Sequence, residues 1–249
     1  MIGQLKLRVH ERTCIIVSHC NGVPIETATA WYLSVAEALV AVTNTHVLET
    51  VHHMRTFGDP AAWYELSAGA GRQAVQIRGG YMLMPHDSTH QSSVPSKYGL
   101  LDFALLKVPD NARGYVLGGK KAFTLSDIDE SGPDVGRLMF WLGYPNDSVA
   151  ASPPDIMTPY LEGESKLFAT RVVRVEDRLL VLRGLKSYGY GHAELIGVSG
   201  SAVLDAGGCV RAVLWGGSDD LNEIYACPIR HVVQELPRIL EAGRNDAPT

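Results

Sequence analysis

Ser199 lies between two glycines in the stretch LIGVSGSAVL (195–204), and this setting would suit a nucleophile. A serine hydroxyl is weakly nucleophilic at neutral pH and is activated by an adjacent base, usually a histidine. That histidine needs an acidic partner, which fixes its tautomer and stabilises the imidazolium. A turn that simply requires small residues would explain the same stretch without any chemistry. The interpretation therefore depends on whether a matching histidine and aspartate occur elsewhere in the chain.

Both partners occur in settings that fit these roles. His46 follows the apolar segment ALVAVT (38–43), which would hold the imidazole at the end of a strand. Asp102 opens the alternating segment DFALLKV (102–108), where an unpaired carboxylate would be costly to bury. A histidine Nδ1–H would offset that cost. We therefore predict that Ser199 is a nucleophile, His46 its base and Asp102 the acid that orients the base.

Short segments with period-two alternation dominate the chain and predict an all-β fold that positions these residues. Gly, Pro, Asn and Asp bound most of them, as in sandwiches and barrels. The expected strands are KLRVH (6–10), TCIIVS (13–18), TATAWYLS (27–34), ALVAVT (38–43), QAVQIRG (73–79), YMLMP (81–85), DFALLKV (102–108), RLMFWLGYP (137–145), KLFATRVVRV (166–175), RLLVLRG (178–184), SAVLDAGG (201–208), CVRAVLWGG (209–217) and EIYACPI (223–229).

Helical patterns are few. Residues 46–55 could form one or two helical turns, and the apolar spacing in 229–243 predicts a C-terminal helix that Pro237 should bend or divide. The polar, Gly-rich segment PDNARGYVLGGKKAF (109–123) separates two β-rich halves. We therefore expect a β unit over 1–115, a second over 116–228 and a helix over 229–243.

The composition is that of a globular chain with a substantial core. Of 249 residues, 46% are hydrophobic and 20% are charged, with a net charge of −5. No basic patch suggests a nucleic-acid partner, and no apolar run approaches the roughly 18 residues that span a membrane. The first residues, MIGQLKLRVHERT, lack the apolar stretch and cleavage site of a secretory signal. We expect a cytoplasmic protein, unless a leader has been removed.

Metal binding is not expected from the cysteine and histidine pattern. No Cys-x-x-Cys pair occurs, and the His86/His90 pair lies in an apparent loop. A cytoplasmic protein keeps its thiols reduced, so free cysteines are favoured over two disulfides. The four cysteines are Cys14, Cys20, Cys209 and Cys227.

Three segments in this order resemble motifs of the trypsin-like serine peptidases of chymotrypsin fold. They are Thr-Asn-x-His-Val (43–47), Asp-Phe-Ala-Leu-Leu-Lys-Val (102–108) and Gly-x-Ser-Gly-Ser-x-Val (197–203). The likeness is strongest to the bacterial HtrA-like proteases and glutamyl endopeptidases, and it covers roughly residues 25–235. It implies two packed six-stranded antiparallel β-barrels, with His46 and Asp102 from the first and Ser199 from the second.

The resemblance also implies an activity and further site residues. The chain would be a serine endopeptidase that acts on proteins or peptides through an acyl-enzyme and requires neither a metal nor a cofactor. The N–H groups of Gly197 and Ser199 would form the oxyanion hole. The segment VLWGG (213–217), with Leu214, Trp215 and Gly216, would pair with the substrate backbone as an added strand.

The residue before the serine departs from the trypsin pattern. Val198 stands where trypsins have an aspartate that pairs with a newly formed N-terminal amine, and no Ile-Val-Gly-Gly start is present. Activation by that ion pair is not expected, so packing or another partner must hold the loop. Either the oxyanion hole is formed in the free protein, or an activating partner protein or the substrate completes it.

Substrate preference is left open by the residues before the loop. Ala193 occupies the position of the aspartate at the base of the trypsin pocket. Leu195 and Ile196 suggest apolar walls and a small or apolar residue before the scissile bond. Glu194, if it points into the pocket, would instead favour lysine or arginine. A preference for glutamate would require a pocket histidine, for which His192 is the nearby candidate.

The sequence is compatible with two functions other than a peptidase. A non-catalytic peptide-binding module on the same fold is the main alternative, although it would not need to keep His46, Asp102 and Ser199 together. An esterase of α/β-hydrolase fold is disfavoured, because its Gly-x-Ser-x-Gly turn requires glycine where this chain has Ser201.

Overall fold

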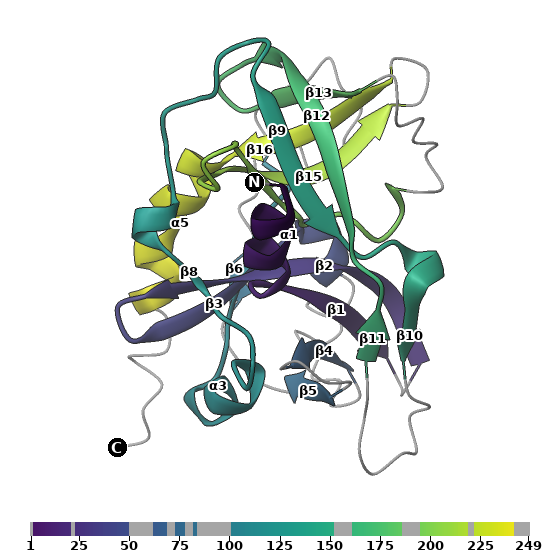
Figure 1. Ribbon diagram of the computed structural model, residues 1–249. Helices are drawn as coiled ribbons and strands as arrows, with labels where there is room; N and C mark the ends of the chain where they lie inside the picture. The colour runs from purple at the N-terminus through teal and green to yellow at the C-terminus, as the bar shows by residue number, and fades with distance from the viewer. Residues whose placement is uncertain are drawn as a thin grey trace.

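The computed structural model describes most of the chain as two groups of β-strands with helices at their edges (Figure 1). The described residues are 2–20, 23–49, 62–68, 73–77, 82–83, 101–151, 161–185, 195–218 and 222–241. One group forms an open sheet and the other a closed barrel.

The first group is an eight-stranded sheet with the order β5-β4-β1-β2-β3-β7-β6, in which β8 pairs with β2 in parallel. The central strand β2 pairs with both β1 and β3. These strands are β1 (Thr13–Cys20), β2 (Val23–Val35), β3 (Ala38–Thr43), β4 (Ala62–Ala68), β5 (Gln73–Ile77), β6 (Met82–Leu83), β7 (Ala104–Lys107) and β8 (Phe123–Thr124).

The second group closes into a six-stranded antiparallel barrel in the order β12-β13-β16-β15-β14-β9. On its longest strand, Phe168, Thr170 and Val172 are buried and the residues between them are less buried, as expected of a strand with one face in a core. The barrel strands are β9 (Leu138–Gly143), β12 (Lys166–Val175), β13 (Leu180–Gly184), β14 (Ala202–Leu204), β15 (Val210–Ser218) and β16 (Glu223–Pro228); β10 (Val149–Ala151) pairs with β11 (Leu161–Gly163) outside it.

The N-terminal segment is a helix, which corrects the prediction of a strand at 6–10. Helix α1 (Ile2–His10) buries Leu5 and Val9 on one face, and the four-residue spacing of these side chains suits a helix. Arg8 on the same helix forms an ion pair with Asp127, 2.5 Å away. The alternation at 6–10 is too short to distinguish the two structures.

The other described helices are short, except for the C-terminal one. They are α3 (Asp110–Val116), the 3₁₀ turns η1 (Leu125–Asp127) and η2 (Asn146–Ser148), a helical turn at 45–49, and α5 (Ile229–Glu241). Helix α5 confirms the C-terminal prediction, but it continues through Pro237 instead of dividing there. No helix in the described residues is long and apolar enough to cross a membrane.

One hydrophobic cluster joins the two groups of strands and α5. It includes Trp31 and Leu105 of the sheet, Val181 and Val213 of the barrel, and Leu236 of α5. Helix α5 contacts strands of both groups, and Figure 1 shows it along one side of the molecule. The two groups therefore share part of their core.

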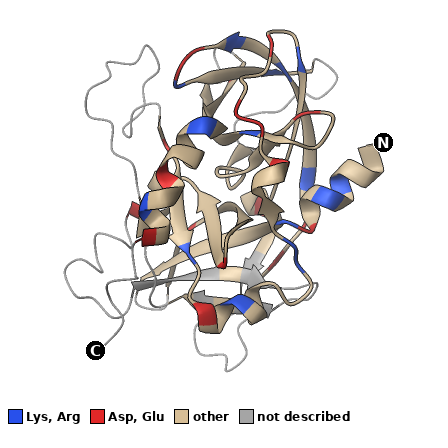
Figure 2. Ribbon diagram, turned by 90° about the vertical axis from the view of Figure 1, so that its left-hand side faces the viewer, with Lys and Arg blue, Asp and Glu red and all other residues tan. Residues whose placement is uncertain are grey.

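None of the four cysteines forms a disulfide. Lysine and arginine are interspersed with aspartate and glutamate over the part of the molecule drawn in Figure 2. Strand β4 is an element that the sequence analysis did not predict.

Candidate active site

The imidazole of His46 is hydrogen-bonded to the carboxylate of Asp102. Nδ1 of His46 donates to Oδ2 of Asp102 over 2.7 Å. Because a carboxylate only accepts, Nδ1 carries the proton and Nε2 remains an acceptor. His46 follows β3 and Asp102 precedes β7, and these strands pair at Thr43 and Ala104. Strand pairing thus brings together two residues that are distant in the sequence.

Backbone donors hold the buried carboxylate in place. Asp102 is 2% exposed. Its Oδ1 accepts the N–H groups of Thr45, at 2.9 Å, and His46, at 3.3 Å. The Asn44 side chain donates to the Asp102 carbonyl at 2.5 Å, and the Thr45 hydroxyl donates to the Phe103 carbonyl at 2.8 Å. The two N–H groups on Oδ1 offset the cost of burying the charge and orient the carboxylate, and the two side-chain bonds hold the main chain at Asp102 and Phe103.

A second carboxylate approaches the other side of the imidazole. Oε1 of Glu26 lies 3.9 Å from Nε2 of His46. Burial alone would lower the pKa of His46, but the hydrogen bond and charge of Asp102, with the charges of Glu26 and Glu49, raise it overall. The pKa of Glu26 is also raised, mainly by burial and further by the charge of Asp102, while His46 opposes the shift.

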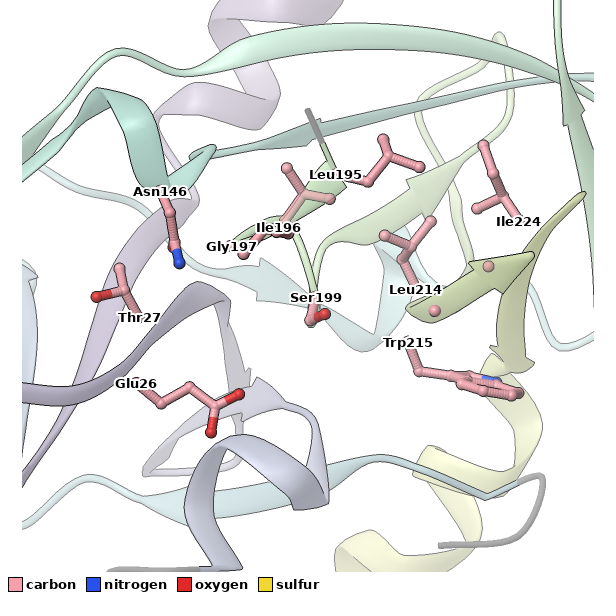
Figure 3. A pocket seen from close by; sticks show the side chains of 13 residues that line it. Glu26, Thr27, Asn146, Leu195, Ile196, Gly197, Ser199, Leu214, Trp215 and Ile224 are labelled. Carbon is pink, nitrogen blue, oxygen red and sulfur yellow. The ribbon is translucent and has the colours of Figure 1, made fainter. Parts of the chain in front are cut away.

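A pocket of about 220 Å³ opens beside this pair, and Ser199 lies in it (Figure 3). Glu26 and Thr27 of β2 lie on one side of Ser199, and Leu214 and Trp215 of β15 lie on the other. The lining residues are Glu26, Thr27, Asn146, Leu195, Ile196, Gly197, Val198, Ser199, Leu214, Trp215, Gly216, Gly217 and Ile224.

The peptide group between Ile196 and Gly197 presents its N–H away from the neighbouring η2 turn. The Ile196 carbonyl accepts the N–H of Asn146 over 2.9 Å. No described peptide bond is cis, and in a trans peptide the N–H points opposite to the carbonyl. Gly197 has φ of +91°, and a Cβ there would lie 2.2 Å from Oδ1 of Asn146. This position therefore requires glycine, and its N–H has no acceptor among the described residues.

The peptide group between Val198 and Ser199 is oriented in the same manner. The Val198 carbonyl accepts both the N–H of Ser201, at 3.2 Å, and its hydroxyl, at 2.6 Å. The N–H of Ser199 points the other way and, within the described part of the chain, has no acceptor. Ser199 and Gly197 both line the pocket, and neither N–H has an acceptor among the described residues.

Close contact with the first sheet fixes the loop beyond Ser199. The Ser199 carbonyl accepts the N–H of Thr29 over 2.9 Å. Gly200 has φ of +88°, and a Cβ there would lie 2.1 Å from the Thr29 carbonyl oxygen and 2.5 Å from Oγ1 of Thr43. Glycine at 200 therefore allows β2 and β3 to approach the loop that carries Ser199.

Packing holds Val198, the residue that precedes Ser199. Val198 is 1% exposed and belongs to a barrel cluster with Trp141 and Val203. Strand β9 approaches it closely, because a Cβ at Gly143 would lie 2.7 Å from the Val198 Cβ. Burying such a side chain contributes about 1.5–3 kcal/mol. This finding supports the expectation that packing can hold the loop without an ion pair.

One edge of β15 is open beside the pocket. Pairing of β15 with β14 ends at Val213, and Leu214 then exchanges hydrogen bonds with Gly200 and Ser201. From Gly216 onward, β15 pairs only with β16 among the described strands. An extended peptide could therefore add to this edge as a further antiparallel strand.

Comparisons by sequence found no relative: no family model and no curated protein matches the chain. Solved structures do match. The Rv3671c protease from M. tuberculosis in its active form aligns over 94% of this chain and 83% of its own, with TM-score 0.59 and 15% identity. A serine endoprotease from Yersinia pestis aligns over 98% of this chain and 68% of its own, with TM-score 0.62 and 12% identity. This chain has the trypsin-like serine protease fold.

The trypsin-like fold was predicted from the three motifs and is confirmed, with the second unit seen as a closed barrel and the first as an eight-stranded sheet. Of the predicted site residues, His46 and Asp102 are in contact. Ser199, Gly197, Leu214, Trp215 and Gly216 line the pocket. Ala193, Glu194, His192, His86 and His90 lie outside the described residues.

The sequence analysis did not identify three polar residues that line this pocket: Glu26, Thr27 and Asn146. Glu26 offers one weak signal, a charged residue just before a long apolar segment. Nothing in the neighbouring sequence shows that this end of β2 lies near the loop of the barrel that carries Ser199. The contact arises only when the two units pack together.

Proposed function

We propose that the protein is a serine endopeptidase with His46, Asp102 and Ser199 as its catalytic residues. The observation that carries the proposal is the His46–Asp102 pair, which leaves Nε2 as an acceptor beside the pocket that contains Ser199. Two oriented N–H groups in the same pocket, those of Gly197 and Ser199, supply a site for an oxyanion. A nucleophile, a base and anion donors are the components that acyl transfer requires.

In the proposed mechanism, Oγ of Ser199 attacks the carbonyl carbon of the scissile peptide bond. Nε2 of His46 takes the hydroxyl proton, and Asp102 stabilises the resulting imidazolium. The N–H groups of Gly197 and Ser199 bind the oxyanion of the tetrahedral intermediate. His46 then gives its proton to the leaving amine, which departs and leaves an acyl-enzyme. Water, activated by His46, hydrolyses this ester and restores Ser199.

The substrate chain is proposed to lie along the open edge of β15 at Trp215–Gly217, as an added antiparallel strand. The apolar side chains of Leu195, Ile196, Leu214 and Ile224 line the pocket next to this edge. They support a preference for a small or apolar residue before the scissile bond. A basic residue there would depend on Glu194, which lies outside the described residues.

Labelling with a fluorophosphonate, followed by peptide mass spectrometry, tests the proposal directly. The expected result is a single adduct on Ser199, which disappears in His46→Ala because the hydroxyl loses its base. His231→Ala is a matched control, since His231 is a half-buried histidine of α5 whose Nε2–H donates to the backbone carbonyl of Asp177, and it is absent from the pocket lining.

An adduct in the wild type and in His231→Ala, but not in His46→Ala, supports an assembled nucleophile. Equal labelling in His46→Ala, or labelling of another residue, contradicts the proposed triad. If no adduct forms even with cell extract present, the chain is a peptide-binding module on a protease fold.

An activating partner remains a prediction from the replacement at Val198. The orientation of the Ile196 carbonyl toward Asn146 supports the alternative, in which the oxyanion hole is already formed in the free protein. The same labelling distinguishes the two, because a formed hole gives equal rates with and without cell extract. A large rate increase with extract would support the partner.

We also propose that the protein acts in the cytoplasm. Its four cysteines form no disulfide, which supports this location, since a reducing compartment keeps thiols from forming disulfides. Cell fractionation with detection of the chain tests it, and recovery in an extracytoplasmic fraction would contradict it.

A further inference from the structure

The carboxylate of Glu26 has no assigned role in the proposed mechanism, although it lies in the pocket. Glu26 carries the only charged side chain among the described lining residues. Among the described residues, the basic atom within 4.0 Å of this carboxylate is Nε2 of His46, at 3.9 Å, and the carboxylate accepts no hydrogen bond from that part of the chain. A carboxylate that faces a binding pocket without a close partner can receive a cation from the substrate.

The transfer of a proton from His46 to the leaving amine determines which part of the substrate lies near Glu26. The leaving amine must take its proton from Nε2 of His46, so it departs within hydrogen-bond distance of that atom. Because Oε1 of Glu26 is 3.9 Å from Nε2, the residues that follow the scissile bond pass close to Glu26.

The positions of the residues that line the pocket support the same assignment. The open edge of β15, which would bind the acyl part of the substrate, lies on the side of Ser199 where Leu214 and Trp215 are seen. Glu26 lies on the opposite side, with Thr27 (Figure 3). The acyl and leaving parts of the substrate extend in opposite directions from the reacting carbonyl, so Glu26 belongs to the leaving-group side.

We propose that Glu26 selects substrates with lysine or arginine among the first two residues after the scissile bond. This inference rests on the proposed peptidase function and adds a specificity-determining residue to it. Only neutral side chains, those of Thr27 and Asn146, lie near Glu26 in the lining of this side. The Glu26 side chain is 39% exposed, so a cation can reach it while partly hydrated.

Digestion of a peptide library, read by mass spectrometry, tests the assignment. Wild type, Glu26→Gln, Glu26→Lys and the control Glu37→Gln are compared at pH 8.5, on the alkaline side of the ordinary histidine pKa, to limit the effect of each substitution on the protonation of His46. Glu37 is an exposed glutamate at the turn between β2 and β3 and is absent from the pocket lining. Ser199→Ala serves as the blank for cleavage by other proteases.

We expect the wild type and Glu37→Gln to enrich lysine and arginine after the cleavage site. In Glu26→Gln this enrichment should fall about tenfold, the effect of one partly hydrated charge pair, and in Glu26→Lys it should reverse toward aspartate and glutamate. High salt should weaken the wild-type preference. The preference before the scissile bond should be the same in all variants, which a general structural defect would not produce.

Cleavage by the wild type and by the three variants at Glu26 and Glu37 with the same leaving-side preference would overturn the assignment of Glu26 and leave the peptidase function standing. Absence of both cleavage and Ser199 labelling would overturn the proposed function, and this inference with it. The labelling result therefore separates the two failures.

Discussion

At the scale of single residues, the imidazole of His46 lies between two carboxylates. Asp102 accepts from Nδ1 and is fixed by backbone N–H groups, whereas Glu26 approaches Nε2 and is partly exposed. Both negative charges stabilise the imidazolium, so they act together on the pKa of His46. Asp102 also fixes the tautomer that the proposed mechanism needs, and Glu26 does not.

The pH dependence of kcat/KM should report this arrangement. Only the neutral imidazole acts as base, and the charges of Asp102, Glu26 and Glu49 raise the pKa of His46. We expect kcat/KM to rise with pH through a midpoint above about 6.5, the ordinary value for histidine. Glu26→Gln removes one negative charge and should move the midpoint to lower pH.

Glu37→Gln is the control for this measurement, because its charge change is remote from the imidazole. A wild-type midpoint at or below the ordinary histidine value would contradict the prediction. So would identical profiles for Glu26→Gln and wild type.

At the scale of elements, the loop 195–201 carries Ser199 and contacts elements of both groups of strands. Its two glycines with positive φ are adjacent to different elements: Gly197 to the η2 turn and Gly200 to strands β2 and β3. The carbonyls of Ile196 and Val198 both accept N–H groups, those of Asn146 and Ser201. The loop geometry therefore depends on its neighbours as much as on its own turn.

Gly200→Ala should destabilise the fold and misplace Ser199. The left-handed φ costs about 1–2 kcal/mol, and the overlap with Thr29 and Thr43 adds about 1–3 kcal/mol, so we expect a loss of about 2–5 kcal/mol. Urea unfolding measures the loss, and the rate of fluorophosphonate labelling should fall with it.

Gly136→Ala is the matched control, because Gly136 has the same φ of +88° but no heavy atom within 4 Å of its Cβ position. It isolates the conformational cost from the overlap. Equal destabilisation of the two variants would show that the close approach at Gly200 does not contribute.

At the scale of the whole molecule, Thr29 links the two groups of strands at the site. Its hydroxyl donates to the Gly197 carbonyl and accepts the N–H of Tyr144, each over 3.0 Å, while its own N–H donates to the Ser199 carbonyl. Thr29 is fully buried in β2. A shared hydrophobic cluster holds the two groups together, and Thr29 sets their alignment at the pocket.

Thr29→Val keeps the shape but removes both hydroxyl hydrogen bonds. The Gly197 carbonyl and the Tyr144 N–H would be left buried without partners, at about 1–3 kcal/mol each. We expect a clear fall in the free energy of unfolding and slower labelling of Ser199. Thr29→Ser retains the hydroxyl and should stay close to wild type in labelling rate; equal effects of the two variants would contradict a role for these hydrogen bonds.

Local patterns along the chain were sufficient for most strands and for the order of the motifs. Short apolar or alternating segments identified β3 and β12 with the bounds that the structure has. Strand β12 is buried on one face and therefore keeps a period-two pattern, whereas β3 is buried at every residue but its first. Shorter or helix-compatible segments were ambiguous, as at 6–10, where packing of Leu5 and Val9 selected a helix. Pro237 likewise did not end α5, whose apolar face packs on both groups of strands.

Tertiary structure decided how the candidate residues are arranged. The types of His46, Asp102 and Ser199 and their flanking residues were visible in the sequence, but their contacts depend on strand pairing and on packing between the two units. Glu26 and Asn146 entered the pocket for the same reason, without any local signal strong enough to single them out. The periodicity of apolar residues shows which face of a helix or strand is buried. It does not show which distant element covers that face, because the covering element is determined only when the chain folds.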